Sequence, residues 1–211
     1  MSRLPLLALL PLLACGTQDA PPGDAIGTFA FVASLDEGGA ILDPPESTPR
    51  CRFEGAPDRI EFDGSLSHDP EGDAAWLLID GTLREGTLEG ATFDLSLPRE
   101  PDGSIRGVPR RLPACTCDLL FVEKIDGALV ESSTEGCRPP QEPVEVGPAT
   151  CPRLGEDGEL AWDSCGGICG TLREEVRFEA SGCSCEVDGV QEQVAGVCQF
   201  VWALQGTRIG G

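Results

Sequence analysis

Residues 59–66, with the sequence RIEFDGSL, indicate the fold class, because apolar and polar side chains alternate along them with a period of two. This alternation is typical of a β-strand that buries one face and exposes the other. Helical periodicity is nearly absent; residues 172–176 are the one stretch compatible with it. We therefore predict an all-β protein of about nine or ten short strands, arranged as an antiparallel β-sandwich or a meandering barrel. The other predicted strands cover residues 28–35, 75–79, 92–97, 119–125, 160–162, 172–178 and 197–204.

Turn-forming residues separate these strands. Asp80-Gly81 follows residues 75–79, and Asp126-Gly127 follows residues 119–125. Asp-Gly is a strong signal for a two-residue hairpin turn, so we expect a turn at both places. Residues 98–113 are rich in proline and glycine and predict a long exposed loop.

A proline-rich stretch, residues 138–150, predicts a connector between two parts of the chain. The first part, residues 26–137, is a β-rich unit. The second, residues 151–211, is a smaller cysteine-rich β unit that is short for an independent core and would need disulfides as staples. The alternative is that the two parts form one continuous domain.

Two short sequence patterns occur twice. Residues 81–85 and 170–174 both read GTLRE, and residues 115–117 (CTC) correspond to residues 183–185 (CSC). The patterns predict two related halves. Chance repetition in a chain rich in glycine, threonine, leucine and glutamate is the alternative.

The N-terminus has the form of an export signal. Arg3 precedes an apolar run over residues 4–13, which is too short to span a membrane as a helix. The run ends in Leu12-Leu13-Ala14-Cys15, which resembles the lipobox of bacterial lipoprotein precursors.

This resemblance implies that residues 1–14 are a lipoprotein signal peptide, that cleavage follows Ala14, and that Cys15 is acylated. Residues 15–25 would then be a lipidated tether. More than one acyl chain makes such anchoring stable. In many lipoproteins retained at the inner membrane, an aspartate directly follows the acylated cysteine. Here Gly16 follows Cys15, so the resemblance implies an outer-membrane lipoprotein on the periplasmic or surface face.

The chain has 11 cysteines, and ten remain when Cys15 is assigned to lipid. In an exported chain an even set predicts a disulfide framework, although its connectivity is not deducible from sequence. Residues i and i+2 of a strand are badly aligned for a mutual disulfide, so each member of a Cys-x-Cys pair should bond a different partner. Thiolate metal binding and a redox dithiol are the alternatives, but the spacings match neither well. The ten cysteines are Cys51, Cys115, Cys117, Cys137, Cys151, Cys165, Cys169, Cys183, Cys185 and Cys198.

The formal net charge is −21, from 36 acidic and 15 basic residues. Such a protein is repelled by phosphate backbones, so we expect no nucleic acid partner. An acidic protein is better suited to bind divalent cations, cationic ligands or basic protein surfaces. The alternative is that the negative charge has no binding role and only keeps the protein soluble.

Catalytic signals are weak. The chain has one histidine, His68, and no tyrosine. Ser65, Ser67, His68 and Asp69 are crowded into one loop, whereas a catalytic triad assembles from separate elements. No phosphate-binding glycine loop, zinc helix or EF-hand loop is present. We therefore predict that the protein is not an enzyme and uses no cofactor; a carboxylate-only hydrolase is the least supported hypothesis.

Residues 62–73 and 90–97 resemble parts of bacterial Ig-like domains of the PKD type, through their Asp-Gly-Ser and Asp-Pro-Glu-Gly-Asp segments. The resemblance implies a β-sandwich with an adhesion or spacer role. Four carboxylates could then gather around calcium, which prefers clustered oxygen ligands. Acidic turn residues more often cap their own backbone. The four are Asp63, Asp69, Glu71 and Asp73.

The lipobox, the short tether and the β-rich body together look similar to uncharacterised cysteine-rich lipoproteins of high-GC bacteria, a similarity that implies no activity. We predict a lipid-anchored, disulfide-stabilised cell-envelope protein acting as a non-catalytic binding, adhesion or structural module. Its partners would be the membrane, through the lipid, and an envelope protein or cell-surface partner. A periplasmic metal-binding protein is the alternative, and a barrel cavity for a small apolar ligand stays open.

Overall fold

The computed structural model describes residues 20–35, 51, 56–132, 137, 145–147, 150–177, 182–193 and 197–211. Within these ranges the protein is all-β apart from one 3₁₀ turn, η1 (Trp162–Ser164), and no helix there is long and apolar enough to cross a membrane. The described strands are β1 (Asp24–Leu35), β2 (Arg59–His68), β3 (Ala74–Ile79), β4 (Thr82–Glu89), β5 (Thr92–Ser96), β6 (Val108–Arg110), β7 (Leu119–Val130), β8 (Arg153–Leu154), β9 (Leu160–Ala161), β10 (Gly167–Arg177), β11 (Ser184–Val187), β12 (Val190–Gln193) and β13 (Val197–Gly210).

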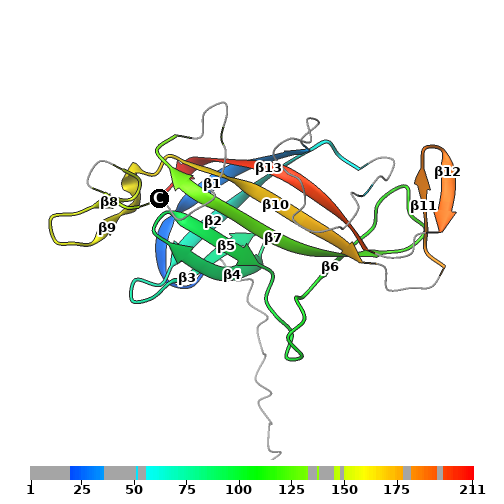
Figure 1. The fold of residues 1–211 in the computed structure, drawn as a ribbon, viewed down its shortest axis with the longest axis horizontal. Helices are drawn as coiled ribbons and strands as arrows, with labels where there is room; N and C mark the ends of the chain where they lie inside the picture. Colours follow the sequence, from blue (N-terminus) through cyan, green and yellow to red (C-terminus); the bar gives the residue numbers. More distant parts are fainter. Residues whose placement is uncertain are drawn as a thin grey trace, which may run out of the picture.

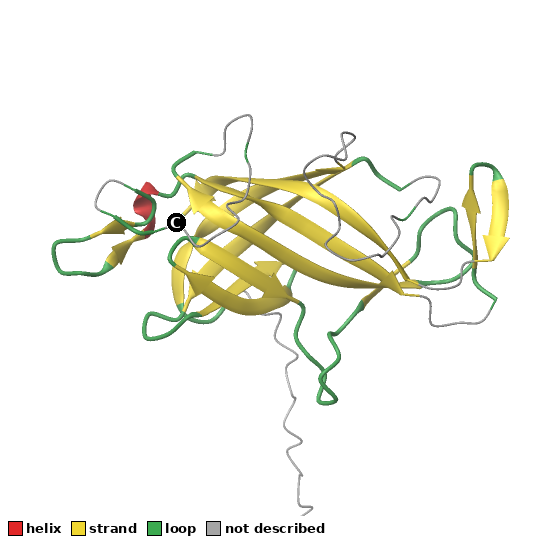
Figure 2. Ribbon diagram, in the orientation of Figure 1, coloured by secondary structure: helices red, strands yellow, loops and turns green. Residues whose placement is uncertain are grey.

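Eight of these strands form a closed antiparallel barrel, visible in Figure 1. The order around the barrel is β1, β2, β3, β4, β5, β7, β10 and β13, and β13 pairs with β1 to close it. Closure leaves no unpaired edge among these eight strands. β6 is not part of this closed order, and it pairs with the first residues of β7. The hairpins β8–β9 and β11–β12 are separate and project beyond opposite ends of the barrel (Figure 2).

The alternation seen in the sequence becomes the two faces of the barrel wall. In β1, Phe29, Phe31 and Ala33 are buried, whereas the residues between them are half-buried. Phe31 stacks on Phe62 of β2 with ring centroids 5.1 Å apart. Trp202 of β13 is also fully buried. Apolar side chains from neighbouring strands therefore fill the interior, as expected for a barrel of this size.

The structure corrects the prediction of a turn at Asp126-Gly127. β7 runs through both residues to Val130, with Gly127 opposite Phe93 on one side and Gly170 on the other. A Cβ added at Gly127 would lie 2.7 Å from the carbonyl oxygen of Cys169. Glycine is needed here because two strands approach closely, not because the chain turns.

Asp80-Gly81, by contrast, forms the predicted hairpin turn between β3 and β4. Both residues have positive φ, 49° and 72°. Positive φ at both central positions is the requirement of a type I′ turn, which Asp-Gly satisfies at low cost.

One sheet contains strands that precede residues 138–150 in the sequence and strands that follow them. β10 pairs with β7, and β13 pairs with β1, so the C-terminal segment supplies two of the eight barrel strands. β10 includes residues 172–176, the stretch with helix-compatible spacing, as strand. β1 begins at Asp24, inside the predicted tether, and residues 1–19 with Cys15 lie outside the described residues.

The two GTLRE copies are not equivalent in the structure. In β4, Arg84 points into the barrel and is buried. In β10, Leu172 and Glu174 line the interior, whereas Arg173 pairs with Asp126 on the outer face. The matching residues therefore face opposite sides of the wall, since side chains alternate with a period of two.

All ten predicted cysteines form disulfides in the structure. Cys115 bonds Cys185 and Cys117 bonds Cys183, so the two Cys-x-Cys segments are joined to each other and each member has a different partner, as predicted. These two bonds attach the β11–β12 hairpin to the segment before β7. The other bonds are Cys51–Cys198, Cys137–Cys169 and Cys151–Cys165.

Candidate ligand site in the barrel

A cavity of about 290 Å³ opens beside the β3–β4 turn. The barrel wall is uneven here, because β3, β4 and β5 have six, eight and five residues, whereas β1, β7 and β13 have 12, 12 and 14. β6 pairs with the first residues of β7 and contributes Val108 and Arg110 to the lining. The lining residues are Ile60, Glu61, Phe62, Ile79, Asp80, Thr82, Arg84, Val108, Arg110, Glu123, Ile125, Leu172 and Glu174.

Four charged side chains form a network on one wall of this cavity. The Nε atom of Arg84 donates to Glu123 Oε2 at 3.0 Å, and Arg84 also donates to the carbonyl oxygens of Ile79 and Thr82 at 3.1 and 2.7 Å. Arg110 reaches both acids, because it pairs with Glu123 and donates to Glu174 Oε1 at 2.6 Å. Two positive and two negative groups therefore balance inside the wall, as buried charges require.

Glu174 is held most deeply. Its side chain is 4% exposed, and its second oxygen accepts a hydrogen bond from Trp202 Nε1 at 3.0 Å. Burial raises the pKa of Glu174, and the neighbouring Arg110 partly offsets that rise. Both oxygens of Glu174, like both oxygens of Glu123, are occupied by N–H donors.

Arg110 differs from the other three members of the network in its exposure. Its side chain is 38% exposed, against 7% for Arg84, 5% for Glu123 and 4% for Glu174. Its guanidinium carbon lies 4.7 Å from the centre of the Phe121 ring, a cation–π contact that orients it. Arg110 is therefore the network member that a molecule entering the cavity meets first.

The remaining wall is mostly apolar. Ile60 and Phe62 of β2, Ile125 of β7 and Leu172 of β10 contribute hydrocarbon surface to the cavity. A concave apolar pocket with a few fixed polar groups is the usual form of a small-molecule site. The arrangement is chemically suited to holding a small molecule with an apolar body and a polar group that hydrogen-bonds beside Arg110.

His68 and the serines near it, which the sequence did not favour as a catalytic set, are not part of this cavity. Trp162 Nε1 donates to His68 Nε2 at 3.0 Å, which leaves the proton of the neutral ring on Nδ1, facing the Asp69 carbonyl oxygen at 3.2 Å. Ser67 Oγ instead donates to the carbonyl oxygen of Pro22 at 2.5 Å. His68 therefore has a packing role at the end of β2, and the structure assembles no serine–histidine pair there.

The four carboxylates considered as alternative calcium ligands are not brought together either. Asp63 is exposed in the middle of β2, opposite Ala30, away from the turn that carries the other three. Asp69 Oδ1 accepts a hydrogen bond from the backbone N–H of Glu71 at 3.0 Å, so it caps its own turn. Across the described ranges, no group of three or more histidine, cysteine, aspartate or glutamate side chains is placed to hold a metal ion.

Sequence reasoning missed all four charged residues of the network. Arg110 lies in residues 98–113, which were predicted to be an exposed loop and instead include β6. Glu123 carried a usable signal, since it occupies an inward position of the alternating strand that also buries Phe121 and Ile125. A charge at a core position of a strand usually has a buried partner.

A scan against protein-family models and searches of curated proteins and of solved structures found no match.

Proposed function

We propose that this protein is a lipid-anchored, disulfide-stabilised binding protein of the bacterial cell envelope, without catalytic activity, and that its barrel cavity holds a small ligand. The observation that carries the binding role is the cavity of about 290 Å³, whose lining combines apolar side chains with the half-exposed guanidinium of Arg110 and, at its edge, Glu61 and Asp80. An eight-stranded barrel leaves room for one small ligand at most. A cavity of this size suits a compact molecule rather than a long lipid chain.

The location rests on the sequence of the first fifteen residues, where the apolar run over residues 4–13 precedes Leu12-Leu13-Ala14-Cys15. Five disulfides agree with an oxidising compartment outside the cytoplasm. The outer membrane, on its periplasmic or surface face, is the proposed site of anchoring.

The binding role is tested by screening a fragment library against the purified, oxidised barrel with ligand-observed NMR. The variant Val108→Trp places a large ring in the cavity from β6, where the half-buried position of Val108 tolerates it better than the core would. The matched control is Val190→Trp, at an exposed site of β12 outside the cavity. Hits that lose at least tenfold in affinity in Val108→Trp and keep it in Val190→Trp support the proposal; a library without hits, or hits indifferent to Val108→Trp, contradicts it.

The anchoring is tested separately by intact mass of the exported protein. Cleavage before Cys15 with two or three acyl chains is the expected result, and Cys15→Ser should remain unacylated and leave the membrane fraction. A mature N-terminus at any other residue contradicts the lipoprotein assignment without touching the cavity.

A further inference from the structure

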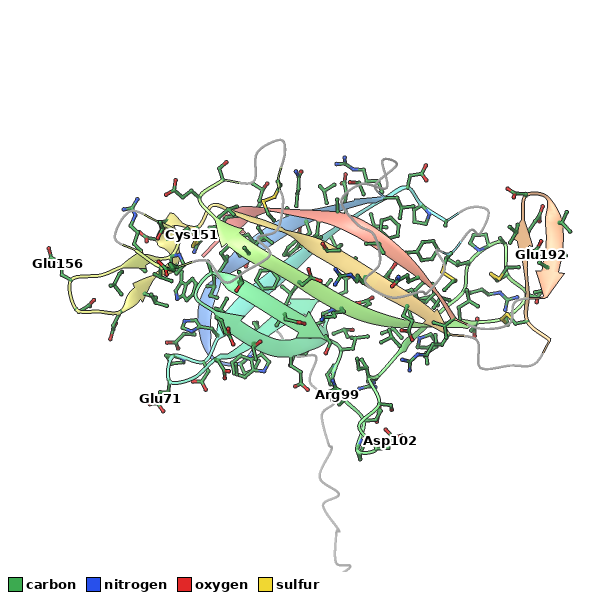
Figure 3. All side chains as sticks on the ribbon, in the orientation of Figure 1. Glu71, Arg99, Asp102, Cys151, Glu156 and Glu192 are labelled. Atoms are coloured by element: carbon green, nitrogen blue, oxygen red, sulfur yellow. A yellow bond between two sulfur atoms is a disulfide. The ribbon has the colours of Figure 1, made fainter. Side chains whose placement is uncertain are left out.

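A second hollow, of about 510 Å³, lies on the outer face of the barrel over β3, β4 and β5. It is separate from the cavity described above, since the two share no lining residue. Arg99, labelled in Figure 3, comes from the loop after β5 and stands at one side of it. The lining residues are Ala74, Trp76, Glu85, Gly86, Thr87, Asp94, Ser96 and Arg99.

Strand register places these side chains in two rows across the barrel wall. Trp76, Glu85 and Ser96 face one another on β3, β4 and β5, and Ala74, Thr87 and Asp94 form the parallel row. Neighbouring strands are about 4.8 Å apart, so each row spans roughly 10 Å. The hollow is therefore a shallow groove with an aromatic ring at one side and hydrogen-bonding groups along the rest.

The floor of the groove is backbone. A Cβ added at Gly86 would lie 1.9 Å from the carbonyl oxygen of Asp94. No side chain larger than hydrogen fits there without moving β5. Gly86 belongs to the inward row of β4, between Arg84 and Leu88, so its lack of a side chain lets β4 and β5 approach closely beneath the groove.

Trp76 differs in burial from the other two tryptophans. Trp162 and Trp202 are buried, whereas Trp76 is half-buried and faces outward beside the groove. An indole ring presents a flat, electron-rich apolar face. The C–H face of a pyranose ring is its natural complement, because it is apolar and carries slight positive charge on its hydrogens.

The opposite side of the groove suits sugar hydroxyls. Glu85 and Asp94 supply carboxylate acceptors, and Thr87 and Ser96 supply hydroxyls. Asp94 is held by Lys124 at 2.8 Å, and Arg99 is oriented by its hydrogen bond to the carbonyl oxygen of Gly103 at 2.9 Å. Neighbouring hydroxyls of a sugar ring both donate and accept hydrogen bonds. They therefore match this combination of carboxylates and hydroxyls better than a ligand with a single charged group does.

From this geometry we infer that the outer face of β3–β5 binds a neutral pyranose oligosaccharide, with one ring stacked on Trp76 and its hydroxyls bonded to Glu85 and Asp94. Acidic polysaccharides are disfavoured by the net charge of −21 and by the two carboxylates in the groove. The open shape of the groove accommodates an extended chain and predicts weak, reversible binding.

The test is ligand-observed NMR titration of the full oxidised protein with maltotriose, cellotriose and tri-N-acetylchitotriose, and with trigalacturonate as the charged comparison. At least one neutral trisaccharide should bind saturably, and trigalacturonate should bind at least tenfold more weakly. Trp76→Ala should lose binding at least tenfold, and Trp76→Phe, which keeps a ring, should lose less.

Glu85→Gln gives a test that does not depend on the packing of Trp76, and it should weaken binding about three- to tenfold. Its matched control is Glu89→Gln, which changes another exposed glutamate of β4 outside the groove and should leave binding unchanged. The inference is overturned if none of the three neutral trisaccharides binds, if trigalacturonate binds best, or if the Trp76 and Glu85 variants bind like the unsubstituted protein.

Discussion

Arg110 and Glu174 lie 64 residues apart in the chain, and inside the barrel the guanidinium of Arg110 donates to Glu174 Oε1 at 2.6 Å. The pair links β6, an added strand, to β10, a strand of the closed barrel. Glu123 stands between them on β7 and joins Arg110 to Arg84. One polar network therefore ties four strands together beside the cavity.

The first prediction concerns pH. Burial raises the pKa of Glu174 above its ordinary value of 4.5, so the folded state holds this proton more tightly than the unfolded chain does. The stability that this group contributes is therefore fully present below that ordinary value and is lost as pH rises through the raised pKa, by at most about 1.4 kcal/mol per pH unit. Glu174→Gln stays neutral at every pH, so the unsubstituted protein should lose stability relative to this variant as pH rises.

This is measured by urea unfolding between about pH 4 and pH 8, with the disulfides intact. Glu89→Gln, a substitution of an exposed glutamate on β4, controls for loss of a carboxylate as such. Parallel stability profiles for the unsubstituted protein and Glu174→Gln would contradict the prediction.

The second prediction concerns the buried pair of Arg84 and Glu123. Glu123→Leu leaves Arg84 buried without a carboxylate, which should cost about 3 to 5 kcal/mol of unfolding free energy. The double variant Arg84→Met, Glu123→Leu removes both charges and should recover most of that loss, since Arg110 still pairs with Glu174. Urea unfolding of the single and double variants measures the difference; a double variant no more stable than Glu123→Leu would refute it.

The third prediction concerns the two disulfides that join the Cys-x-Cys segments. With Cys117–Cys183 intact, Cys115–Cys185 closes only a very short additional loop, so removing it with two serines should cost about 2 kcal/mol. Removing both bonds opens a loop of 66 residues that the intact Cys137–Cys169 bond shortens by 32, to about 34, and should cost roughly 6 kcal/mol on the chain-entropy model.

The two losses are therefore expected to be strongly non-additive, because either bond alone holds the β11–β12 hairpin in place. Chemical unfolding of the two single-bond variants and the double variant measures this. Equal increments for the first and second bond would show that the hairpin is not held in this redundant way.

The fourth prediction concerns Gly127. Gly127→Ala places a Cβ 2.7 Å from the carbonyl oxygen of Cys169 and 3.0 Å from the Phe93 ring, so β7 and β10 must separate. The expected loss is about 3 kcal/mol or more, at the upper end of overpacking effects. Gly147→Ala is the control, since its Cβ would meet nothing nearer than 3.7 Å. Thermal unfolding compares the two, and equal midpoints would contradict the account of Gly127.

The strands were largely predictable because burial on one face imprints a local pattern. Residues 59–66 and 92–97 alternate in the sequence and form β2 and β5 with the same alternation of buried and exposed positions. Asp80-Gly81 and Asp126-Gly127 show where local information ends. The dipeptides are identical, but one turns and the other continues as strand, because only the second lies between two strands whose backbones approach it.

The candidate site was not predictable for a related reason. Arg84, Arg110 and Glu174 are ordinary surface residue types, and even Glu123, whose inward position in an alternating strand is a local signal, does not reveal its partners until its neighbours across the barrel are known. Closure of the sheet by β7 with β10 and by β13 with β1 determines those neighbours. Side-chain pairing across strands follows register, which the alternating pattern alone does not specify for strands distant in the chain.

By itself, the sequence determined the all-β class and the positions of the 11 cysteines, because side-chain alternation and residue counts are properties of the chain. Its first fifteen residues also carry the proposal of a lipid anchor at Cys15. The tertiary structure alone decided which cysteines bond, which strands close the barrel, and which charges meet beside the cavity. The physical reason is that burial patterns act over a few residues, whereas Cys51–Cys198 and Arg110–Glu174 depend on contacts between segments 147 and 64 residues apart.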